Sequence, residues 1–468
     1  MGASSGKPNK GLGTYEYGNL YRSEEKIYPR EIKGRFATLR RLAVIVLLGL
    51  FYGMPWVTWD GRQAVLFDLP ARKFYVFGLT LWPQDFIYLA LLLIIAAVSL
   101  FFFTAIAGRI WCGFACPQTV WTEAFIWIEQ KIEGNRSQRM KLDRGPWTAN
   151  KIIRKSTKQF IWIVLALFTG FSFVGYFVEI RQLAVDLATF TAGPWAWFWV
   201  LFYGFATYGN AGFMREQVCK YMCPYARFQS AMFDKDTLIV TYDEKRGEPR
   251  GPRRRGIDPA EKGLGDCIDC TMCVQVCPTG IDIRQGLQYE CIACAACVDA
   301  CDSVMDKMNY PRGLIRYSTE NALHDKPYHL MRPRTIVYST ILVTLLAVLL
   351  SLIVFRQPVI LDVLRDRNTL YRDAGSRGIE NSYTVRIVNK HNVPHTYRLS
   401  VTGLPGLEIR TATEIDVAPE SVASLPVSVT VPHEYAIGGN TIEFRIESLE
   451  DGAIAMTEES RFRGPEEQ

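Results

Sequence analysis

The stretches that decide the fold of the middle of the chain are "CIDCTMCVQVCP", Cys267–Pro278, and "CIACAACVDACD", Cys291–Asp302. Both place four cysteines in the spacing Cys-x2-Cys-x2-Cys-x3-Cys, which is the spacing of bacterial ferredoxins with two 4Fe–4S clusters. Zinc would use four ligands in two pairs, and disulfides are unfavourable in a reducing compartment. The spacing therefore predicts a ferredoxin-like domain with two 4Fe–4S clusters as cofactors.

The same spacing predicts which cysteines share a cluster. Three closely spaced thiolates can wrap three irons of one cubane, and the fourth ligand must come from the other run. We therefore expect two ligand sets, each taking its last cysteine from the opposite run: Cys267, Cys270, Cys273 and Cys301 for one cluster, and Cys291, Cys294, Cys297 and Cys277 for the other.

The rest of the chain has the composition of a membrane protein. Of its 468 residues, 49% are hydrophobic and 13% aromatic, while a mean hydropathy of +0.04 indicates that apolar spans are diluted by soluble parts. Charge-free apolar segments long enough to cross about 30 Å of hydrocarbon number five: 42–59, 86–108, 159–178, 194–214 and 335–355. A globular protein with buried core helices is the alternative, and this number of uncharged runs disfavours it.

Loop charges predict the orientation of these spans. The loop between the second and third spans holds ten basic residues, whereas the loop after the third has only Arg181. The positive-inside rule then places the N-terminus, the 109–158 loop and the ferredoxin in the cytoplasm, and the C-terminal tail outside. The polar first residues lack the apolar core of a signal peptide. A net charge of +6 is modest for this length, so we expect membrane lipid and no nucleic acid as a partner.

Four further cysteines lie at the cytoplasmic ends of two spans, in "RIWCGFACPQ" (109–118) and "REQVCKYMCPYARF" (215–228). Positions i and i+4 share a helical face, so each pair, Cys112 with Cys116 and Cys219 with Cys223, can present two sulfurs to one ligand. The following prolines suit the first turn of a new helix. We expect the helix N-terminus, Arg109 and Arg215 to lower the thiol pKa values.

Several kinds of site remain open for these four cysteines. Thiolates select soft ions such as Cu(I), while tetrahedral sulfur also suits zinc or an iron–sulfur centre. A redox dithiol and inert buried cysteines are further readings. All five histidines follow residue 320, so the first four spans lack the ligands of a bis-histidine haem.

After residue 356, short segments alternate apolar and polar residues, as in "SYTVRIVNK" and "NTIEFRIESL", with turn signals between them. This pattern predicts an immunoglobulin-like β-sandwich without disulfides. The whole chain is therefore expected to be a polytopic α-helical membrane protein of about five spans with two added domains. The expected boundaries are an N-terminal arm (1–38), a four-span membrane domain (39–232), an Arg/Gly/Pro-rich flexible linker with the ferredoxin domain (233–334), a fifth span (335–356) and the Ig-like domain (357–468).

These features in this order resemble the CcoG/FixG/RdxA accessory proteins of cbb-type cytochrome oxidases over essentially the full length. The resemblance implies a Cu(II) reductase of the bacterial cytoplasmic (inner) membrane that supplies Cu(I) for oxidase assembly, with a periplasmic Ig-like domain. It implies copper binding and catalysis at Cys112, Cys116, Cys219 and Cys223, with electrons carried by the ferredoxin clusters. It also implies a copper transporter or chaperone and oxidase assembly factors as partners, and it leaves the electron donor unidentified.

Two other classes of function fit the same residues. One is a quinol-oxidising electron-transfer subunit of a respiratory system, similar to the ferredoxin-containing membrane subunits of nitrate or nitrous-oxide systems. The other is a non-redox assembly scaffold, in which the clusters would be structural.

Overall fold

The structure is a computed structural model that describes residues 26–367, 369–452 and 454–466. Most of the predicted N-terminal arm therefore lies outside the described residues. The chain forms two compact units, which we describe separately. Unit 1 combines Met1–Met54, Ser99–Gly175 and Ile180–Ser339, and unit 2 combines Pro55–Val98, Tyr176–Glu179 and Thr340–Gln468.

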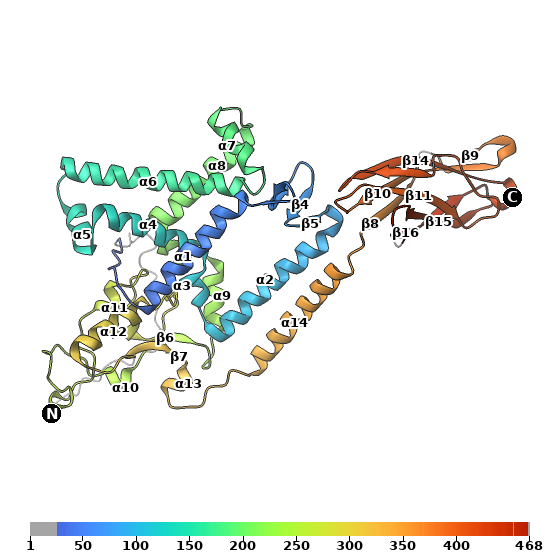
Figure 1. Ribbon diagram of the computed structural model, residues 1–468. Coiled ribbons are helices and arrows are strands. Elements are labelled where there is room, and N and C mark those ends of the chain that lie inside the picture. The colour runs from blue at the N-terminus through green and yellow to red at the C-terminus, as the bar shows by residue number, and fades with distance from the viewer. Residues whose placement is uncertain (1–25, 368, 453, 467–468) are drawn as a thin grey trace, which may run out of the picture. The chain divides into compact units, whose positions relative to one another are not determined.

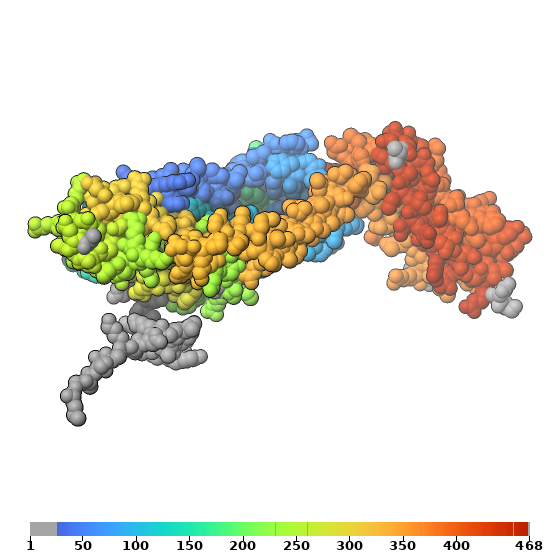
Figure 2. Space-filling model, turned by 90° about the horizontal axis from the view of Figure 1, so that it is seen from below, coloured from blue at the N-terminus to red at the C-terminus, as the bar shows by residue number. Residues whose placement is uncertain are grey.

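Among the described residues, four helices are long and apolar enough to cross a membrane (Figure 1). They are α1 (Arg35–Gly53), α2 (Phe86–Ala107), α6 (Ala149–Val174) and α14 (Pro333–Val354). Within α2 and α14 the most apolar windows bury no residue at all, and α14 lies at the surface in Figure 2. Exposed apolar helices of this length are stable in hydrocarbon and not in water, which indicates membrane association.

The predicted fourth span differs from the expectation. Residues 194–214 form α8 (Pro194–Thr207), which is 14 residues long, and then a π-helix (Tyr208–Met214). At 1.5 Å per residue, α8 alone spans about 21 Å, less than the hydrocarbon core. Gly170 on α6 allows close packing against α8, because a Cβ there would lie 2.2 Å from the Val200 carbonyl oxygen. The count of long apolar helices is thus four, one fewer than the predicted number of spans.

Two of the spanning helices begin earlier than their apolar runs predict. Helix α1 starts at Arg35 and includes Arg40 and Arg41, and α6 starts at Ala149 and includes three lysines. Lys155 and Lys158 each lie 2.9 Å from a carboxylate oxygen of Glu133. Such ion pairs allow charged residues to occupy the ends of apolar helices. A prediction from hydropathy alone leaves these residues out and therefore gives too short a helix.

Short helices connect the spans in unit 1. These are α3 (Ile110–Phe114), α4 (Pro117–Glu133), α5 (Arg136–Arg144), α7 (Ile180–Ala188), a π-helix (Val218–Met222) and α9 (Pro224–Met232). Phe125 on α4 packs against Trp162 on α6, and the Trp162 ring nitrogen donates to the Phe125 carbonyl at 3.1 Å. The two segments with paired cysteines are therefore attached to a packed helical core.

The ferredoxin domain is bounded by two antiparallel strands, β6 (Ile239–Tyr242) and β7 (Ile315–Ser318). Between them lie the longer helix α12 (Ala296–Met308) and short helical turns: α10 (Glu244–Gly247), Ala260–Lys262, α11 (Met272–Gln275) and Ile283–Gln285; α13 (Glu320–Leu323) follows β7. The Arg/Gly/Pro-rich stretch before the first cysteine run is not a free linker. Arg253 donates to the Tyr310 hydroxyl at 2.9 Å, and the Gly251 N–H donates to the Cys267 carbonyl at 3.2 Å.

Unit 2 ends in a β-sandwich whose two sheets follow the orders β12-β14-β10-β8, with β9 beside β10, and β13-β11-β15-β16. The strands are β8 (Val359–Arg365), β9 (Arg372–Asp373), β10 (Ile379–Asn389), β11 (His395–Thr402), β12 (Glu408–Ile409), β13 (Glu414–Val417), β14 (Val422–Val431), β15 (Gly439–Ser448) and β16 (Ala455–Arg463). Tyr383, Tyr397 and Phe444 are among the buried residues of one core. The alternating pattern predicted this Ig-like sandwich.

Sequence patterning did not predict the small strands that follow α1 in unit 2. These are β1 (Thr58–Trp59), β2 (Arg62–Gln63), β3 (Val65–Asp68), β4 (Lys73–Val76) and β5 (Leu79–Leu81). Arg62 pairs with Glu420 at 2.7 Å, and Asp85 pairs with Arg356 and Lys390 at 2.8 Å each. These ion pairs fix the loop to the turns of the sandwich within unit 2.

Candidate redox site

The eight ferredoxin cysteines form two groups in the structure. One cavity is lined by Cys267, Cys270, Cys273 and Cys301, and a neighbouring one by Cys273, Cys277, Cys291, Cys294 and Cys297. Cys301 interacts electrostatically with the first three cysteines of the first run, and Cys277 with the first three of the second. Each run thus lends its last cysteine to the group formed by the other run, as the spacing predicts. The assignment of these cysteines as cluster ligands remains a prediction.

The backbone around the second cysteine is the same in both runs. Asp269 and Thr271 flank Cys270, Ala293 and Ala295 flank Cys294, and all four flanking residues have φ between 53° and 55°. Left-handed residues in a turn direct successive backbone N–H groups toward a common point, an arrangement that binds anionic groups such as cluster sulfurs. Both loops thus have the geometry to hold thiolates with N–H groups directed at them, and the donor set fits 4Fe–4S clusters.

Burial controls the protonation of these thiols in the absence of a cluster. It raises the pKa of Cys273 to about 11 and the pKa values of Cys291 and Cys301 to about 12. Cluster ligands are thiolates, so cluster assembly must release these protons. When bound, each cluster supplies one-electron transfer, which matches a one-electron acceptor.

The four remaining cysteines come from two separate helical segments. Cys112 lies in α3, and Cys116 is the N-cap of α4, with Pro117 as the first helical residue. Cys219 lies in the π-helix Val218–Met222, and Cys223 is the N-cap of α9. The position of Cys116 and Cys223 at helix N-termini is as predicted. The expectation that each pair shares one continuous helical face was wrong, because the chain leaves the helix between the two cysteines of each pair.

The structure brings the two pairs to one place. Cys112 interacts electrostatically with Cys116 and Cys219, and Cys116 and Cys219 each interact with Cys223. The Cys112 thiol donates to the Gln229 side-chain oxygen at 3.2 Å, which ties the first motif to α9. Residues about a hundred positions apart in the sequence therefore form one four-thiol group.

The lowered pKa expected for Cys116 at its helix N-terminus is wrong for the metal-free protein, because burial raises the pKa of this thiol. Burial raises the pKa of Cys112 to about 12 and that of Cys219 to about 11, and the opposing effect of Arg109 is smaller. Arg215 does not face the thiols; its guanidinium donates to Glu129 at 2.9 Å and to the Gly212 carbonyl at 2.9 Å. Desolvation therefore outweighs the arginines, and a bound cation would have to displace the thiol protons.

The first cysteine motif is in direct contact with the ferredoxin. A Cβ at Gly113 would lie 2.7 Å from the Ile292 carbonyl oxygen and 2.8 Å from the Cys294 Cα. The Arg109 guanidinium, 4% exposed, donates to the carbonyls of Tyr289 on the ferredoxin side and Ala226 on α9. The four-thiol group and the second cysteine run thus share a rigid, closely packed boundary, as electron transfer between them requires.

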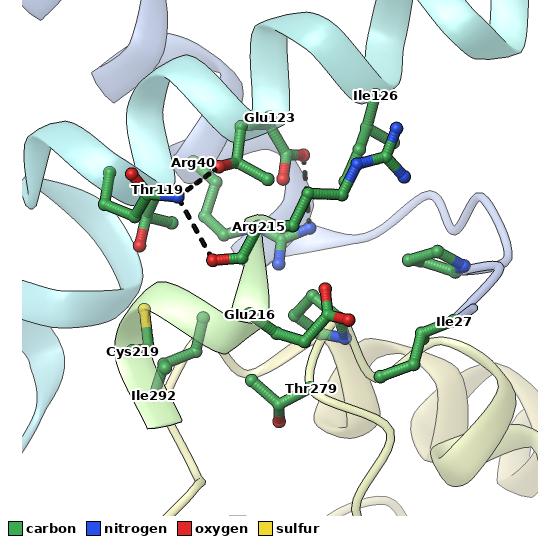
Figure 3. Close-up of a pocket in the computed structure, with 14 residues that line it drawn as sticks. Ile27, Arg40, Thr119, Glu123, Ile126, Arg215, Glu216, Cys219, Thr279 and Ile292 are labelled. Atoms are coloured by element: carbon green, nitrogen blue, oxygen red, sulfur yellow. Dashed lines mark hydrogen bonds and ion pairs between the residues drawn. The ribbon is translucent and has the colours of Figure 1, made fainter. Parts of the chain in front are cut away.

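A small cavity of about 40 Å³ lies beside this boundary (Figure 3). Cys219 and Glu216 line it from the second cysteine motif, Thr119 and Glu123 from α4, and Thr279 and Ile292 from the ferredoxin. Sequence reasoning did not single out Arg40, Glu123 or Gln229. Two sequence features could have indicated the first two residues. Arg40 comes just before the first apolar run, and Glu123 is a charged residue in the amphipathic stretch after Cys116.

Within the described part of the chain, no three Cys, His, Asp or Glu side chains lie close enough together to hold a single metal ion. This applies equally to the ferredoxin cysteines, because a cubane holds its thiolates farther apart than one ion does. A single ion at the four-thiol group would need rotation of the cysteine side chains between staggered conformations.

The fold and the site define a class: membrane-associated iron–sulfur electron-transfer proteins with an Ig-like domain. Family models match residues 214–320 as a "4Fe-4S dicluster domain", residues 89–135 as a "4Fe-4S binding domain" and residues 349–465 as an "IG-like fold at C-terminal of FixG".

Three relatives match along nearly the whole chain. The nitrogen fixation protein FixG of Rhizobium meliloti is 40% identical, over 89% of this chain and 88% of that protein. RdxB and RdxA of Cereibacter sphaeroides are 41% and 40% identical, over 90% and 88% of this chain and 90% and 91% of theirs. The chain belongs to the FixG/RdxA family.

Proposed function

We propose that this protein is a Cu(II) reductase that receives electrons at its ferredoxin clusters and transfers them to copper at Cys112, Cys116, Cys219 and Cys223. The observation that carries the proposal is the convergence of two distant cysteine pairs, with the first motif packed through Gly113 against the backbone of Cys294. A structural role alone gives no reason to gather four unbonded thiols at the boundary with an electron-transfer domain.

The proposed reduction of Cu(II) to Cu(I) is a one-electron step. One electron leaves a reduced cluster and converts Cu(II) to Cu(I), and sulfur ligands stabilise the reduced ion because both are soft. Glu123, Glu216 and Cys219 line the same small cavity, so oxygen ligands suited to Cu(II) lie beside the thiols that suit Cu(I). Binding displaces the thiol protons, which makes copper uptake depend on pH.

We further propose that the protein lies in the bacterial cytoplasmic membrane with its ferredoxin inside and its Ig-like domain in the periplasm. The excess of basic residues in 109–158 supports this orientation. The partners we expect are copper ions, a copper transporter or chaperone, and assembly factors of a cbb-type oxidase.

One observation favours a second candidate for the four thiols. The segment matched as a 4Fe-4S binding domain, 89–135, contains Cys112 and Cys116 and no other cysteine. A third cluster shared by both pairs would use the same residues. Iron analysis separates the candidates, because two clusters give about eight iron atoms per chain and three give about twelve.

The test of copper reduction is anaerobic. The purified full chain, reduced by dithionite and freed of excess reductant, is mixed with Cu(II), and Cu(I) is followed with a colorimetric chelator. We expect rapid Cu(I) formation in the parent and loss of at least about 90% of the rate after all four cysteines are changed to alanine, since removal of ligands costs 10-fold or more. The cluster absorbance of the variant verifies that the ferredoxin is intact. Equal rates in parent and variant would refute the role of these thiols.

A further inference from the structure

A second cavity in unit 1 lies next to the small cavity beside Cys219 and shares Arg40, Glu123 and Pro278 with it. It measures about 530 Å³ and lies between the first turns of α1, the exposed face of α4 and the ferredoxin. Val44 and Ile45 line it from α1, Ala124 and Trp127 from α4, and Val276, Pro278 and Ala296 from the ferredoxin. The last three flank Cys277 and Cys297 in the sequence.

The lining of this cavity changes from polar to apolar. Arg40, Glu123 and Gln130 contribute polar groups, whereas Ile45 and Trp127 are 69% and 56% exposed. Because α1 is one of the helices able to cross a membrane, its exposed Ile45 faces hydrocarbon in the membrane-embedded protein. The cavity therefore suits an amphiphile with a polar head and an apolar tail that enters from the lipid.

Arg40 and Glu123 define the head of the site. Arg40 is 11% exposed and its guanidinium lies 3.6 Å from the Glu123 carboxylate. Arg40 also contacts the thiol of Cys294. The guanidinium of Arg40 and the carboxylate of Glu123 thus place a donor and an acceptor side by side at the head of the site (Figure 3).

A donor beside an acceptor matches a phenolic hydroxyl, which accepts from one and donates to the other. A lipid phosphate would be attracted by Arg40 and by Arg30, Arg41 and Lys131, which also line the cavity, and repelled by Glu123. The carboxylate at the head favours a hydroxyl, and competition with cardiolipin distinguishes the two ligands. We propose that this cavity binds a lipid-soluble hydroquinone, whose electrons enter the protein at the cluster of Cys277, Cys291, Cys294 and Cys297. The inference rests on the proposed electron-transfer function and supplies its donor.

Oxidation of the hydroquinone to the quinone breaks two O–H bonds and releases two protons and two electrons. Glu123 takes the proton of the hydroxyl it faces, and the other passes to water at the polar end of the cavity, where Glu31 is exposed. The electrons pass one at a time to the two clusters, each of which accepts one. Arg40, Glu123 and Pro278 line both this cavity and the small cavity beside Cys219, so the site is contiguous with the copper site.

The first test is binding. Heptyl-hydroxyquinoline N-oxide, a fluorescent quinone-site ligand, is titrated into the full chain in nanodiscs, and its fluorescence quenching is measured. Val44→Phe fills the cavity, and we expect about 10-fold weaker binding from an overpacking cost of 1–3 kcal/mol. Val46→Phe is the matched control: Val46 lies two residues away on α1, is 48% exposed and does not line the cavity. Equal affinities in both variants, or displacement of the probe by cardiolipin alone, would overturn the proposal.

The second test is electron entry. Decyl-hydroquinone is added anaerobically and cluster reduction is read by EPR. Glu123→Gln keeps the shape of the head but cannot take the proton, so we expect hydroquinone-driven reduction to slow about 100-fold while dithionite reduces the clusters as before. Unchanged hydroquinone kinetics in this variant would overturn the site. If dithionite-reduced protein reduces copper but hydroquinone never reduces the clusters, this inference fails and the copper proposal stands. If hydroquinone reduces the clusters but the reduced protein does not reduce copper, the hydroquinone site stands and the copper proposal fails.

Discussion

Glu129 is the residue on which the charges of unit 1 converge. It is fully buried and lies 2.9 Å from Arg215, 3.4 Å from Arg139, 3.6 Å from Lys158 and 3.3 Å from Lys26. Burial alone would raise the pKa of Glu129, but these four cations outweigh it and lower the pKa to about 2. The carboxylate therefore joins α4, α5, α6 and the segment before the second cysteine motif.

We predict that Glu129→Gln destabilises unit 1 by about 3–5 kcal/mol, because it leaves Arg139 and Arg215 buried without their counter-charge. The measurement is thermal unfolding in nanodiscs. Glu414→Gln removes an exposed pair, Glu414 with Arg398 at 3.1 Å, and should cost no more than about 1 kcal/mol.

The same carboxylate predicts a pH dependence. The folded pKa of about 2 lies below the ordinary 4.5, so the stabilisation is present above pH 4.5 and is lost as the pH falls toward 2. In Glu129→Gln this part of the acid transition should be absent. Identical acid profiles for parent and variant would contradict the role of Glu129.

Gly113 sets how closely the first cysteine motif approaches the ferredoxin. Because the atoms that a Cβ would meet belong to the backbone, Gly113→Ala must move α3 away from Cys294, at a cost of about 1–3 kcal/mol. We predict slower electron transfer to copper with unchanged cluster absorbance. Gly49→Ala is the control, since a Cβ at Gly49 in α1 meets nothing within 4 Å. Equal rates in both variants would show that this contact does not matter.

At the scale of elements, the two cysteine motifs are two copies of one arrangement. In each, a long helix ends, a short helical turn carries the first cysteine, and the second caps a new helix that begins with proline. The first cysteine lies in an α-helical turn in one motif and in a π-helix in the other. The duplication places two sulfurs from each copy around a common point.

A shared site predicts non-additive losses. Changing Cys112 and Cys116 to alanine should abolish copper reduction as completely as changing all four cysteines, and so should changing Cys219 and Cys223, because residues acting as a unit are non-additive. Initial rates of Cu(I) formation in the three variants provide the measurement. Half of the parent rate in each double variant would instead indicate two independent sites.

Arg109 joins the elements that form the site, since its donors reach Tyr289 and Ala226 from α3. Lysine keeps the charge but cannot donate in two directions from one planar group. We predict that Arg109→Lys loosens the boundary by about 2–3 kcal/mol and slows copper reduction, and that hydrogen exchange increases in 286–292. Unchanged exchange in this segment would argue against the bridging role.

At the scale of the whole molecule, the sequence predicted the parts whose signal is local. Cysteine spacing predicted the ferredoxin, charge-free runs predicted the spans, and alternation predicted β10, β11, β14 and β15. The strands β8, β13 and β16 and the small strands after α1 were missed, because their patterns are short or their pairing is non-local.

The sequence predicted which cysteines belong to the candidate site, but not how they are arranged in space. No local signal shows that Cys112 and Cys219 meet, since their approach depends on the packing of α4, α6 and α9. The pKa expectation failed because burial outweighs Arg109, which does lower the pKa values of Cys112 and Cys219, and because Arg215 was taken as a neighbour in space. In the fold Arg215 pairs with Glu129, and burial raises the thiol pKa values.

The central claim is that electrons pass from the ferredoxin clusters to copper at the four-thiol group. The direct measurement is freeze-quench EPR of the dithionite-reduced chain after mixing with one equivalent of Cu(II). We predict that the reduced-cluster signal and the Cu(II) signal disappear at the same rate, and that both persist when the four cysteines are alanine. Loss of the Cu(II) signal at the same rate in the alanine variant would contradict the account.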